Sequence, residues 1–139
     1  MSQRKVIRVR EAMKERVDIV DGMTTVSDAL KMMKHITTKS LIVDKRNEDD
    51  EYGIVLMSDI AKQVLAQDRA PDRVNVYEVM SKPVICVDPE MDIRYCARLF
   101  ERFGLSRAPV TEKGKVIGII SFTDMVLRGL IDKEEYHPN

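Results

Sequence analysis

Ser121 and Asp124 are the two side chains of this sequence whose types and spacing best suit the binding of a small molecule. They follow the apolar, β-prone run Gly118-Ile119-Ile120, at the point where a helical pattern begins. The N-terminus of a helix attracts anions, so Ser121 would meet a phosphate there. Asp124 has two acceptor oxygens and suits two neighbouring hydroxyls, such as those of a ribose. The same spacing also describes a helix cap made by Ser121, with Asp124 favouring the positive end of the helix. The two roles are compatible.

Side chains for catalysis are not arranged in any motif that we identify. Cys86 and Cys96 lie in apolar surroundings without a histidine nearby, and the only histidines are His35 and His137. The sequence offers no base-activated nucleophile, no cluster of metal ligands and no Walker-type phosphate loop. We therefore expect no enzymatic activity, no metal and no required cofactor. Two buried free thiols suit the reducing cytoplasm.

Composition narrows the classes of partner. The 139 residues contain 23 basic and 23 acidic side chains, so the formal net charge is zero and does not favour nucleic acid. No apolar run approaches the roughly 20 residues of a transmembrane helix. The polar and basic start of the chain, Met1 to Arg10, is unlike a secretory signal. We expect neither nucleic acid nor a membrane as partner.

An internal repeat organises the chain. At a shift of 67 residues, identical residues recur in both halves, and after position 43 the shift becomes 65. The pairs are Glu11 with Glu78, Met13 with Met80, Val17 with Val84, Val20 with Val87, Asp21 with Asp88, Val43 with Val110, Gly53 with Gly118, Ile54 with Ile119, and Asp59 with Asp124. We predict two repeats, 6–66 and 74–132, joined by a polar linker at 67–73, which contains Pro71.

Each repeat has the pattern strand, helix, strand, strand, helix. The first helices carry apolar residues at helical spacing, and Thr25 and Asp92 could cap them. The predicted strands are 17–20, 40–43 and 52–57 in the first repeat and 84–87, 107–110 and 116–121 in the second. The predicted helices are 26–36 and 59–66, then 93–103 and 124–131. This is an α/β (α+β) fold of two βαββα units, and each alone is small for a stable core.

The two extra residues of the first repeat fall in a charged loop between its second and third strands. This loop contains Glu48-Asp49-Asp50-Glu51, whereas the second repeat has a short turn around Gly114. An acidic run could attract a cation, but this one lacks the alternating ligands and the glycine of a calcium loop. We interpret it as a solvated loop.

The ordered motifs of both repeats resemble those of a tandem pair of cystathionine β-synthase (CBS) domains, a Bateman module. The second repeat carries Gly104-Leu105-Ser106-Arg107-Ala108-Pro109-Val110 and then Gly118-Ile119-Ile120-Ser121-Phe122-Thr123-Asp124. The resemblance covers about residues 6 to 132. It implies that the repeats pack sheet to sheet with pseudo-twofold symmetry and form clefts for adenosine compounds such as AMP, ADP, ATP or S-adenosylmethionine. It also implies a regulatory module that acts on a separate protein target or on its own oligomer.

The resemblance also nominates binding residues. Lys39 and Arg107 would reach phosphates across the pseudo-twofold, although they could equally be solvated surface charges. Lys82, Pro83 and Val84 would flank the adenine, although they could equally form an ordinary turn at the start of a strand. The full predicted set is Lys39, Ser40, Lys82, Pro83, Val84, Ser106, Arg107, Gly118, Ile119, Ser121 and Asp124.

The first repeat departs from this pattern because Leu56 replaces the hydroxyl residue. Gly53 and Asp59 therefore mark a second and weaker cleft, which binds nothing or binds with less phosphate contact, and Ser58 is interpreted as a helix cap. The resemblance further implies a homodimer formed through outer helices, with Val64 and Val126 as exposed contacts. The alternative function is a structural dimerisation or adaptor module without a working ligand site.

Overall fold

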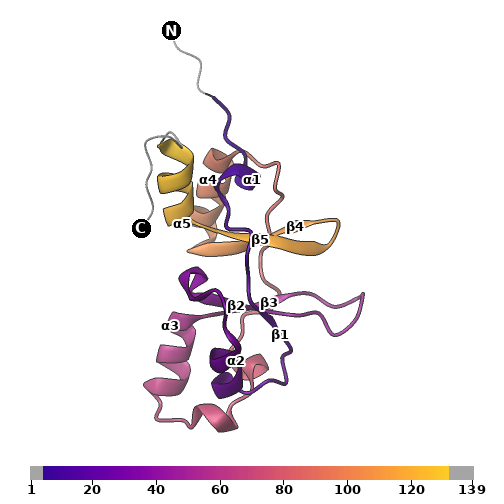
Figure 1. Ribbon diagram of the computed structural model, residues 1–139, viewed down its shortest axis with the longest axis vertical. Helices are drawn as coiled ribbons and strands as arrows, with labels where there is room; N and C mark the ends of the chain where they lie inside the picture. The colour runs from indigo at the N-terminus through magenta and orange to yellow at the C-terminus, as the bar shows by residue number, and fades with distance from the viewer. Residues whose placement is uncertain (1–4, 132–139) are drawn as a thin grey trace. The chain divides into compact units, whose positions relative to one another are not determined.

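Residues 5–131 are described by the computed structural model, in which the chain divides into two units (Figure 1). Unit 2 is the continuous segment Val17–Val84. Unit 1 combines residues 5–16 with residues 85–131 of the described chain. The predicted end of the second repeat at residue 132 and His137 lie outside the described residues. No helix of residues 5–131 is long and apolar enough to cross a lipid bilayer.

Unit 2 contains a three-stranded sheet in the order β1-β2-β3. Strand β1 (Ile19–Val20) runs parallel to β2 (Ser40–Val43), and β2 runs antiparallel to β3 (Gly53–Leu56). All four residues of β2 are buried, as expected for a central strand covered on both faces. On its other edge, β3 is paired with Ser81 through two hydrogen bonds between Ser81 and Ile54, of 3.0 and 2.9 Å.

Helix α2 (Val26–Met32) of unit 2 begins where the sequence predicts it, whereas α3 (Met57–Ile60) begins at Met57, two residues before the predicted start. Helix α2 is capped by Thr25, whose side chain accepts a hydrogen bond from the amide of Asp28 at 3.1 Å. Helix α3 continues as the π-helix η2 (Ala61–Leu65). Short 3-10 turns complete the unit: η1 (Ile36–Thr38), η3 (Pro71–Arg73) and η4 (Val76–Glu78).

Helix α2 ends earlier than predicted, at Met32, and Ile36 lies in η1. The buried carboxylate of Asp18 accepts hydrogen bonds from the amides of Lys34 and His35, both at 2.9 Å. Since these amides bond to a side chain, they are not available to continue the helix.

Unit 1 is built on the antiparallel pair β4 (Arg107–Glu112) and β5 (Lys115–Ser121), with an irregularity between Val110 and Thr111. Lys14 pairs with Ile119 and Val87 pairs with Val110, each as an isolated bridge, so both edges of the ribbon have a backbone partner. The predicted strand at 84–87 is therefore wrong, because only Val87 pairs in this way. The amide of Val84 donates instead to the carbonyl of Tyr52 in unit 2.

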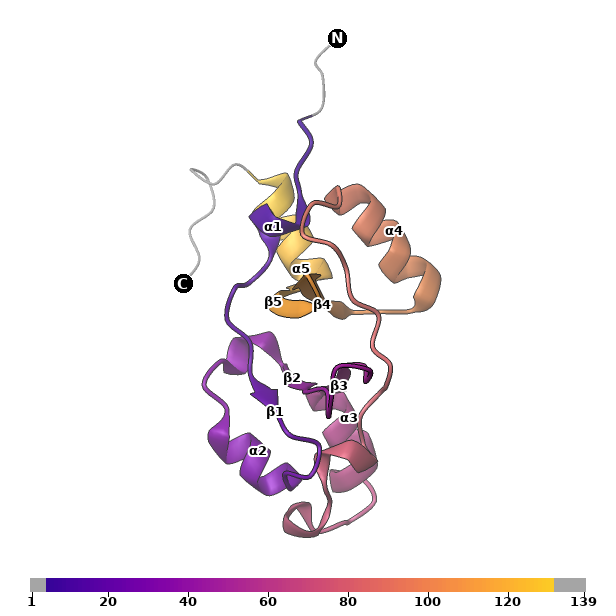
Figure 2. The ribbon, with the colours of Figure 1, turned by 90° about the vertical axis from the view of Figure 1, so that its right-hand side faces the viewer.

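The helices of unit 1 are α1 (Val9–Ala12), α4 (Ile93–Phe103) and α5 (Phe122–Asp124), which continues as the π-helix η5 (Met125–Leu130). Helix α1 lies against η5 and α4 (Figure 2). Asp92 caps α4 by accepting from the Arg94 amide at 2.9 Å. The fully buried Phe100 packs edge-on against Phe122, with ring centroids 5.3 Å apart.

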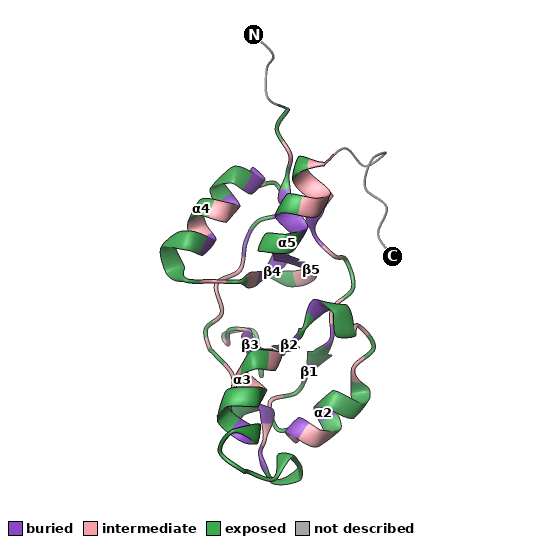
Figure 3. Ribbon diagram, turned by 90° about the vertical axis from the view of Figure 1, so that its left-hand side faces the viewer, coloured by how far each residue is buried: buried purple, intermediate pink, exposed green. Residues whose placement is uncertain are grey.

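Each unit has its own apolar core, and the helices bury one side of their surface while the other stays exposed (Figure 3). Val64 belongs to the core of unit 2 and is only 3% exposed, so the expectation that it is a surface contact is wrong. Its neighbour Leu65 is the exposed residue instead. Val126 is exposed as expected. The predicted α+β class is confirmed.

The two units exchange the starting segments of the two sequence repeats. Helix α1, from the start of the first repeat, folds in unit 1, whereas η4, from the start of the second repeat, folds in unit 2. Each third strand is thereby paired with the starting segment of the other repeat, β5 with Lys14 and β3 with Ser81. The repeat boundaries 6–66 and 74–132, with their 67–73 linker, stay a prediction about the sequence.

Candidate functional site

The turn from β5 into α5, which we call the unit 1 junction (Gly118 to Asp124), has the capping geometry that the sequence predicts. The Oδ2 atom of Asp124 accepts hydrogen bonds from both the amide and the hydroxyl of Ser121, each at 3.0 Å. The amide of Asp124 donates to Ser121 Oγ at 3.2 Å. Asp124 is 4% exposed. The carboxylate is therefore fixed in position by its own turn.

Lys14 is the residue of this junction that sequence reasoning missed. Its Nζ atom lies 3.3 Å from Asp124 Oδ1, the carboxylate oxygen that Ser121 does not use. The backbone of Lys14 exchanges two hydrogen bonds of 2.9 Å with Ile119. Both oxygens of a buried carboxylate therefore have a partner within the chain, as a buried charge requires.

Gly118 makes this approach possible. A Cβ atom added at Gly118 would lie 2.6 Å from the Lys14 carbonyl oxygen and 2.8 Å from Met13 Sδ. Its backbone is not in the left-handed region, so the position needs glycine for space and not for conformation. The glycine of the Gly118 to Asp124 motif thus admits the segment that carries Lys14.

The start of β4 adds Ser106 and Arg107 to the unit 1 junction. Arg107 is paired with Ser121 in the β4–β5 register, and the Ser106 carbonyl accepts from the Phe122 amide at 3.3 Å. Burial lowers the pKa of Arg107 from its ordinary value, and the negative charge of Asp124 opposes that shift. Of the predicted residues, unit 1 thus brings together Ser106, Arg107, Gly118, Ile119, Ser121 and Asp124.

The turn from β3 into α3, which we call the unit 2 junction (Gly53 to Asp59), has the same backbone pattern but fewer side chains that can form hydrogen bonds. Asp59 Oδ2 accepts from the Leu56 amide at 2.9 Å, but Leu56 supplies no hydroxyl. Ser40 is paired with Leu56 and is buried, and its hydroxyl donates to the Thr38 carbonyl at 3.2 Å. Among residues 5–131, Asp59 makes no ion pair.

Lys39 lies directly before β2 in a left-handed conformation, with φ of 56°. Its carbonyl accepts from the Met57 amide at 3.0 Å, which fixes its backbone beside the start of α3, and its side chain is exposed. This predicted residue therefore belongs to the unit 2 junction, where it replaces Ser106 of the other repeat.

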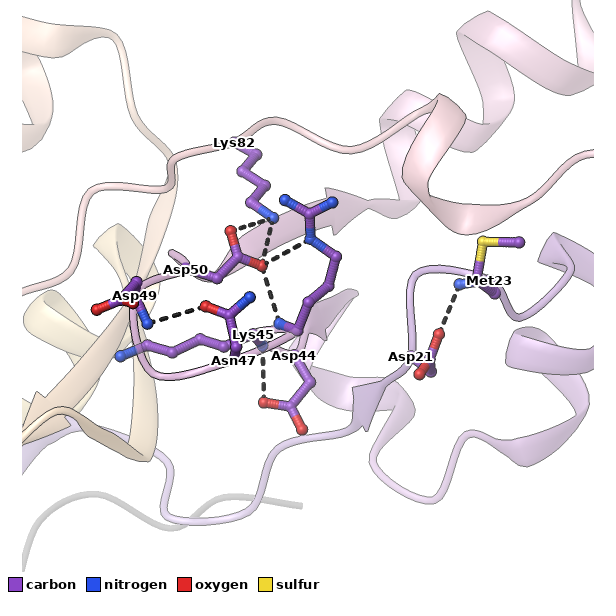
Figure 4. A network of polar contacts seen from close by, with 9 residues as sticks. Asp21, Met23, Asp44, Lys45, Asn47, Asp49, Asp50 and Lys82 are labelled. Atoms are coloured by element: carbon purple, nitrogen blue, oxygen red, sulfur yellow. Dashed lines mark hydrogen bonds and ion pairs between the residues drawn. The ribbon is translucent and has the colours of Figure 1, made fainter.

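Lys82, Pro83 and Val84 also lie in unit 2, beside β3 and the loop that precedes it. Lys82 Nζ lies 2.8 Å from Asp50, which also accepts from the Arg46 amide at 2.8 Å (Figure 4). These donors, Lys82 first, hold the pKa of Asp50 well below its ordinary value of 3.8. The acidic loop is thus not wholly solvated, because the Asp50 side chain is 9% exposed and paired.

The predicted residues are distributed between two junctions. Unit 1 contains the predicted residues from Ser106 onward. Unit 2 contains the rest, which are Lys39, Ser40, Gly53, Asp59, Lys82, Pro83 and Val84. Lys14 aligns with Ser81 in the sequence repeat. It pairs with β5 in unit 1 as Ser81 pairs with β3 in unit 2. The local sequence around Lys14 gives no signal of this contact, because the contact depends on the start of the first repeat folding in unit 1.

The unit 1 junction combines an acceptor, a hydroxyl and two cations. A fixed carboxylate can accept from two vicinal hydroxyls, while the charges of Lys14 and Arg107 can neutralise an anionic group. Burial raises the pKa of Cys96 to about 11, so this thiol stays protonated near neutral pH. Within the described residues, no three metal-binding side chains gather.

A separate cavity of about 650 Å³ lies in unit 1 between the start of the chain, the start of α4 and the end of η5. Its lining is Lys5, Ile7, Glu11, Asp92, Ile93, Arg94, Arg128, Gly129, Leu130 and Ile131, none of which was predicted as a site residue. Its cationic and anionic side chains nearly balance, and Arg94 is paired with Asp92 at 2.7 Å.

Comparison with known sequences identifies both repeats. The model of the CBS domain family matches residues 9–66 and 76–129. A protein of Methanopyrus kandleri described as uncharacterised is 32% identical over 115 residues, which cover 80% of this chain and 58% of that protein. The chain spans between 43% and 59% of the length of this and two further curated relatives.

Solved structures give the same result. The hexameric CBS-CP12 protein from bloom-forming cyanobacteria is 41% identical, with a TM-score of 0.84 over 88% of this chain and 71% of that one. The CBS domain pair of protein MJ0100, in complex with 5′-methylthioadenosine and S-adenosyl-L-methionine, is 21% identical. It has a TM-score of 0.73 over 88% of this chain and 94% of that one, which shows a shared fold.

Proposed function

The chain belongs to the CBS domain family, and we propose that it is a non-catalytic sensor that binds an adenosine-containing ligand at the unit 1 junction. The observation that carries the proposal is the buried carboxylate of Asp124, which is fixed by Ser121 and paired with Lys14, while Arg107 is the strand partner of Ser121. A ribose would bind Asp124, and an anionic group such as a phosphate would meet Ser121 and the cations. The candidate ligands are AMP, ADP, ATP and S-adenosylmethionine.

A protein with the same fold supports an adenosine compound as the ligand. The CBS domain pair of MJ0100 was solved with 5′-methylthioadenosine and S-adenosyl-L-methionine, both of which contain adenosine. We propose that ligand binding here regulates a separate protein or the chain's own assembly. Cys86 and Cys96 form no disulfide, which suits a cytoplasmic setting for such a sensor.

A thermal-shift screen followed by isothermal titration tests the proposal. The first step measures melting temperature with AMP, ADP, ATP, NAD and S-adenosylmethionine, because a ligand at 100 times its Kd adds about 2.7 kcal/mol of stability. The second step titrates the best compound into wild type, Asp124→Ala and Asp59→Ala.

We expect Asp124→Ala to weaken binding by about 1–3 kcal/mol, the range for hydrogen bonds to a charged group, and Asp59→Ala to have a much smaller effect. Far-UV circular dichroism controls for folding, since Asp124 also caps its helix. If Asp59→Ala abolishes binding while Asp124→Ala does not, the ligand binds at the other junction.

A structural homodimerisation or adaptor module is the second candidate function. Exposed apolar side chains of α5 and η5 favour it: Phe122 is 40% exposed, Val126 49% and Leu130 75%. The cyanobacterial CBS-CP12 relative is hexameric. Light scattering at tens of micromolar, roughly the Kd range of weak interfaces, tests assembly. An oligomer that none of the five compounds stabilises would favour this function over the sensor.

A further inference from the structure

The cavity of about 650 Å³ in unit 1 has the size of a small-molecule site, since ligand pockets measure roughly 300–1,000 Å³. Three segments form it: residues 5–11, the start of α4 and the end of η5. Its lining residues lie outside the unit 1 junction, where α5 begins, whereas the cavity lies where η5 ends. The cavity is therefore separate from the site proposed around Asp124.

The walls of the cavity are joined by direct contacts. The amide of Ile93 donates to the carbonyl of Ile7 at 2.9 Å, and Arg8 pairs with Asp92 in an isolated bridge. The π-helix η5 packs against this pair at Gly129, where an added Cβ atom would lie 2.4 Å from Ile93 Cδ1. Because these contacts join all three segments, the cavity exists before a ligand binds. Turns of π-helix are frequent at functional sites.

The charged side chains of the cavity leave positive charge available. Both carboxylates have partners within unit 1, since Asp92 accepts from the Arg94 guanidinium at 2.7 Å and Glu11 accepts from a backbone amide at 2.8 Å. Among the described residues, Lys5 and Arg128 make no ion pair. Arg128 is half-buried, so an anion in the cavity would bind its guanidinium more strongly than at an open surface.

The rest of the lining is mainly apolar. It consists of Ile7, Ile93, Leu130 and Ile131, together with Gly129. Leu130 is largely exposed, and an alkyl or aryl group in the cavity would remove part of this apolar surface from water, which is favourable. The lining thus matches a compound that is apolar over most of its surface and carries one anionic group.

We propose that this cavity is a second binding site of the chain, which takes a small amphipathic anion: an alkyl or aryl group with one carboxylate or phosphate. Arg128 and Lys5 bind the anionic group, and the apolar side chains of the lining contact the rest of the ligand. The inference goes beyond the proposed function, because it concerns another site and another class of ligand.

Isothermal titration of four octyl compounds into the wild-type protein tests the inference. Octanoate and octyl phosphate carry the expected charge, whereas 1-octanol is uncharged and octylamine is cationic near neutral pH. Both anions should bind about tenfold more tightly than 1-octanol, because they gain charge-assisted hydrogen bonds, and octylamine should bind most weakly. Whichever anion binds more tightly identifies the preferred group as a carboxylate or a phosphate.

Two substitutions separate the parts of the site. Arg128→Gln should weaken both anions about tenfold and leave 1-octanol unchanged. Leu130→Ser should weaken octanoate and 1-octanol by the same factor, because it removes apolar contact alone. The matched control is Arg102→Gln, which removes an exposed arginine of α4 outside the cavity and should change none of these affinities.

Equal affinity of all four compounds would overturn the inference, as would failure of both anions to bind at millimolar concentration. Equal weakening of the anions by Arg128→Gln and Arg102→Gln would also overturn it. If Arg128→Gln fails to fold by circular dichroism, Lys5→Gln decides, since Lys5 is exposed, and an unchanged preference for anions in that variant contradicts the site. None of these measurements uses an adenosine compound, so their failure leaves the proposed function standing.

Discussion

Replacement of Gly118 by alanine tests how closely the Lys14 segment must approach β5. The added methyl carbon would lie 2.6 Å from the Lys14 carbonyl oxygen and 2.8 Å from Met13 Sδ. Ordinary close carbon–oxygen contacts are about 3.3–3.6 Å, so one side has to move by about 0.7 Å. The Lys14 carbonyl is also the acceptor for the Ile119 amide, so this movement strains the bridge between the two segments.

The expected loss of stability depends on whether the added methyl carbon meets backbone or a side chain. Overpacking in a well-packed core costs about 1–3 kcal/mol, and the upper part of this range applies here because the obstacle is backbone. Gly53→Ala should cost about 1 kcal/mol, since its methyl carbon meets Met80 Sδ at 2.9 Å but Ser81 O at 3.3 Å. Gly22→Ala, with nearest contacts of 3.4 and 3.5 Å, should stay within about 0.5 kcal/mol.

Urea denaturation followed by far-UV circular dichroism gives the three free energies of unfolding. The expected order of destabilisation is Gly118→Ala, then Gly53→Ala, then Gly22→Ala. If Gly118→Ala is as stable as Gly22→Ala, the segment around Lys14 does not lie as closely on β5 as described. The contact between Lys14 and Asp124 would then lose its structural basis.

Two further predictions concern stability. Phe100→Ala should cost about 3–5 kcal/mol because the ring is fully buried, whereas Tyr95→Ala, at a 59% exposed position of the same helix, should cost far less, and equal costs in urea denaturation would contradict the described core. The pKa of Asp50 is lowered in the folded protein by Lys82 and Arg46, so its stabilisation is present above the unfolded pKa near 3.8 and is lost as the pH falls below that value. Wild type should therefore lose stability more steeply than Asp50→Asn between pH 4 and pH 2, and parallel profiles in urea denaturation would rule out this ion pair.

Most features set by local contacts were predicted correctly from the sequence, but Ser58, expected to be a helix cap, lies inside α3, whose N-cap is Leu56. Thr25 and Asp92 cap their helices as expected, because each accepts from an amide two or three residues further on. The Ser121 and Asp124 cap is likewise a contact within one turn. The strand and helix order followed from apolar periodicity, apart from the strand expected at 84–87 and the ends of single elements.

Features set by contacts between distant segments were not predicted. Lys14 meets Asp124 only because the start of the first repeat folds onto the second, and no local pattern records that exchange. The acidic loop that contains Asp50 is predicted to be solvated because it lacks the ligand pattern of a calcium loop, whereas Lys82, far along the chain, pairs with Asp50. The strand expected at 84–87 was lost for the same reason, since the Val84 amide bonds to Tyr52.

We propose that an adenosine compound binds with its ribose on Asp124. A crystal structure of the protein grown with AMP tests it most directly. We predict that the ribose hydroxyls lie within hydrogen-bond distance of Asp124 and that the phosphate lies beside Ser121. An AMP molecule bound at Asp59 alone, or bound away from both junctions, would contradict the proposed function.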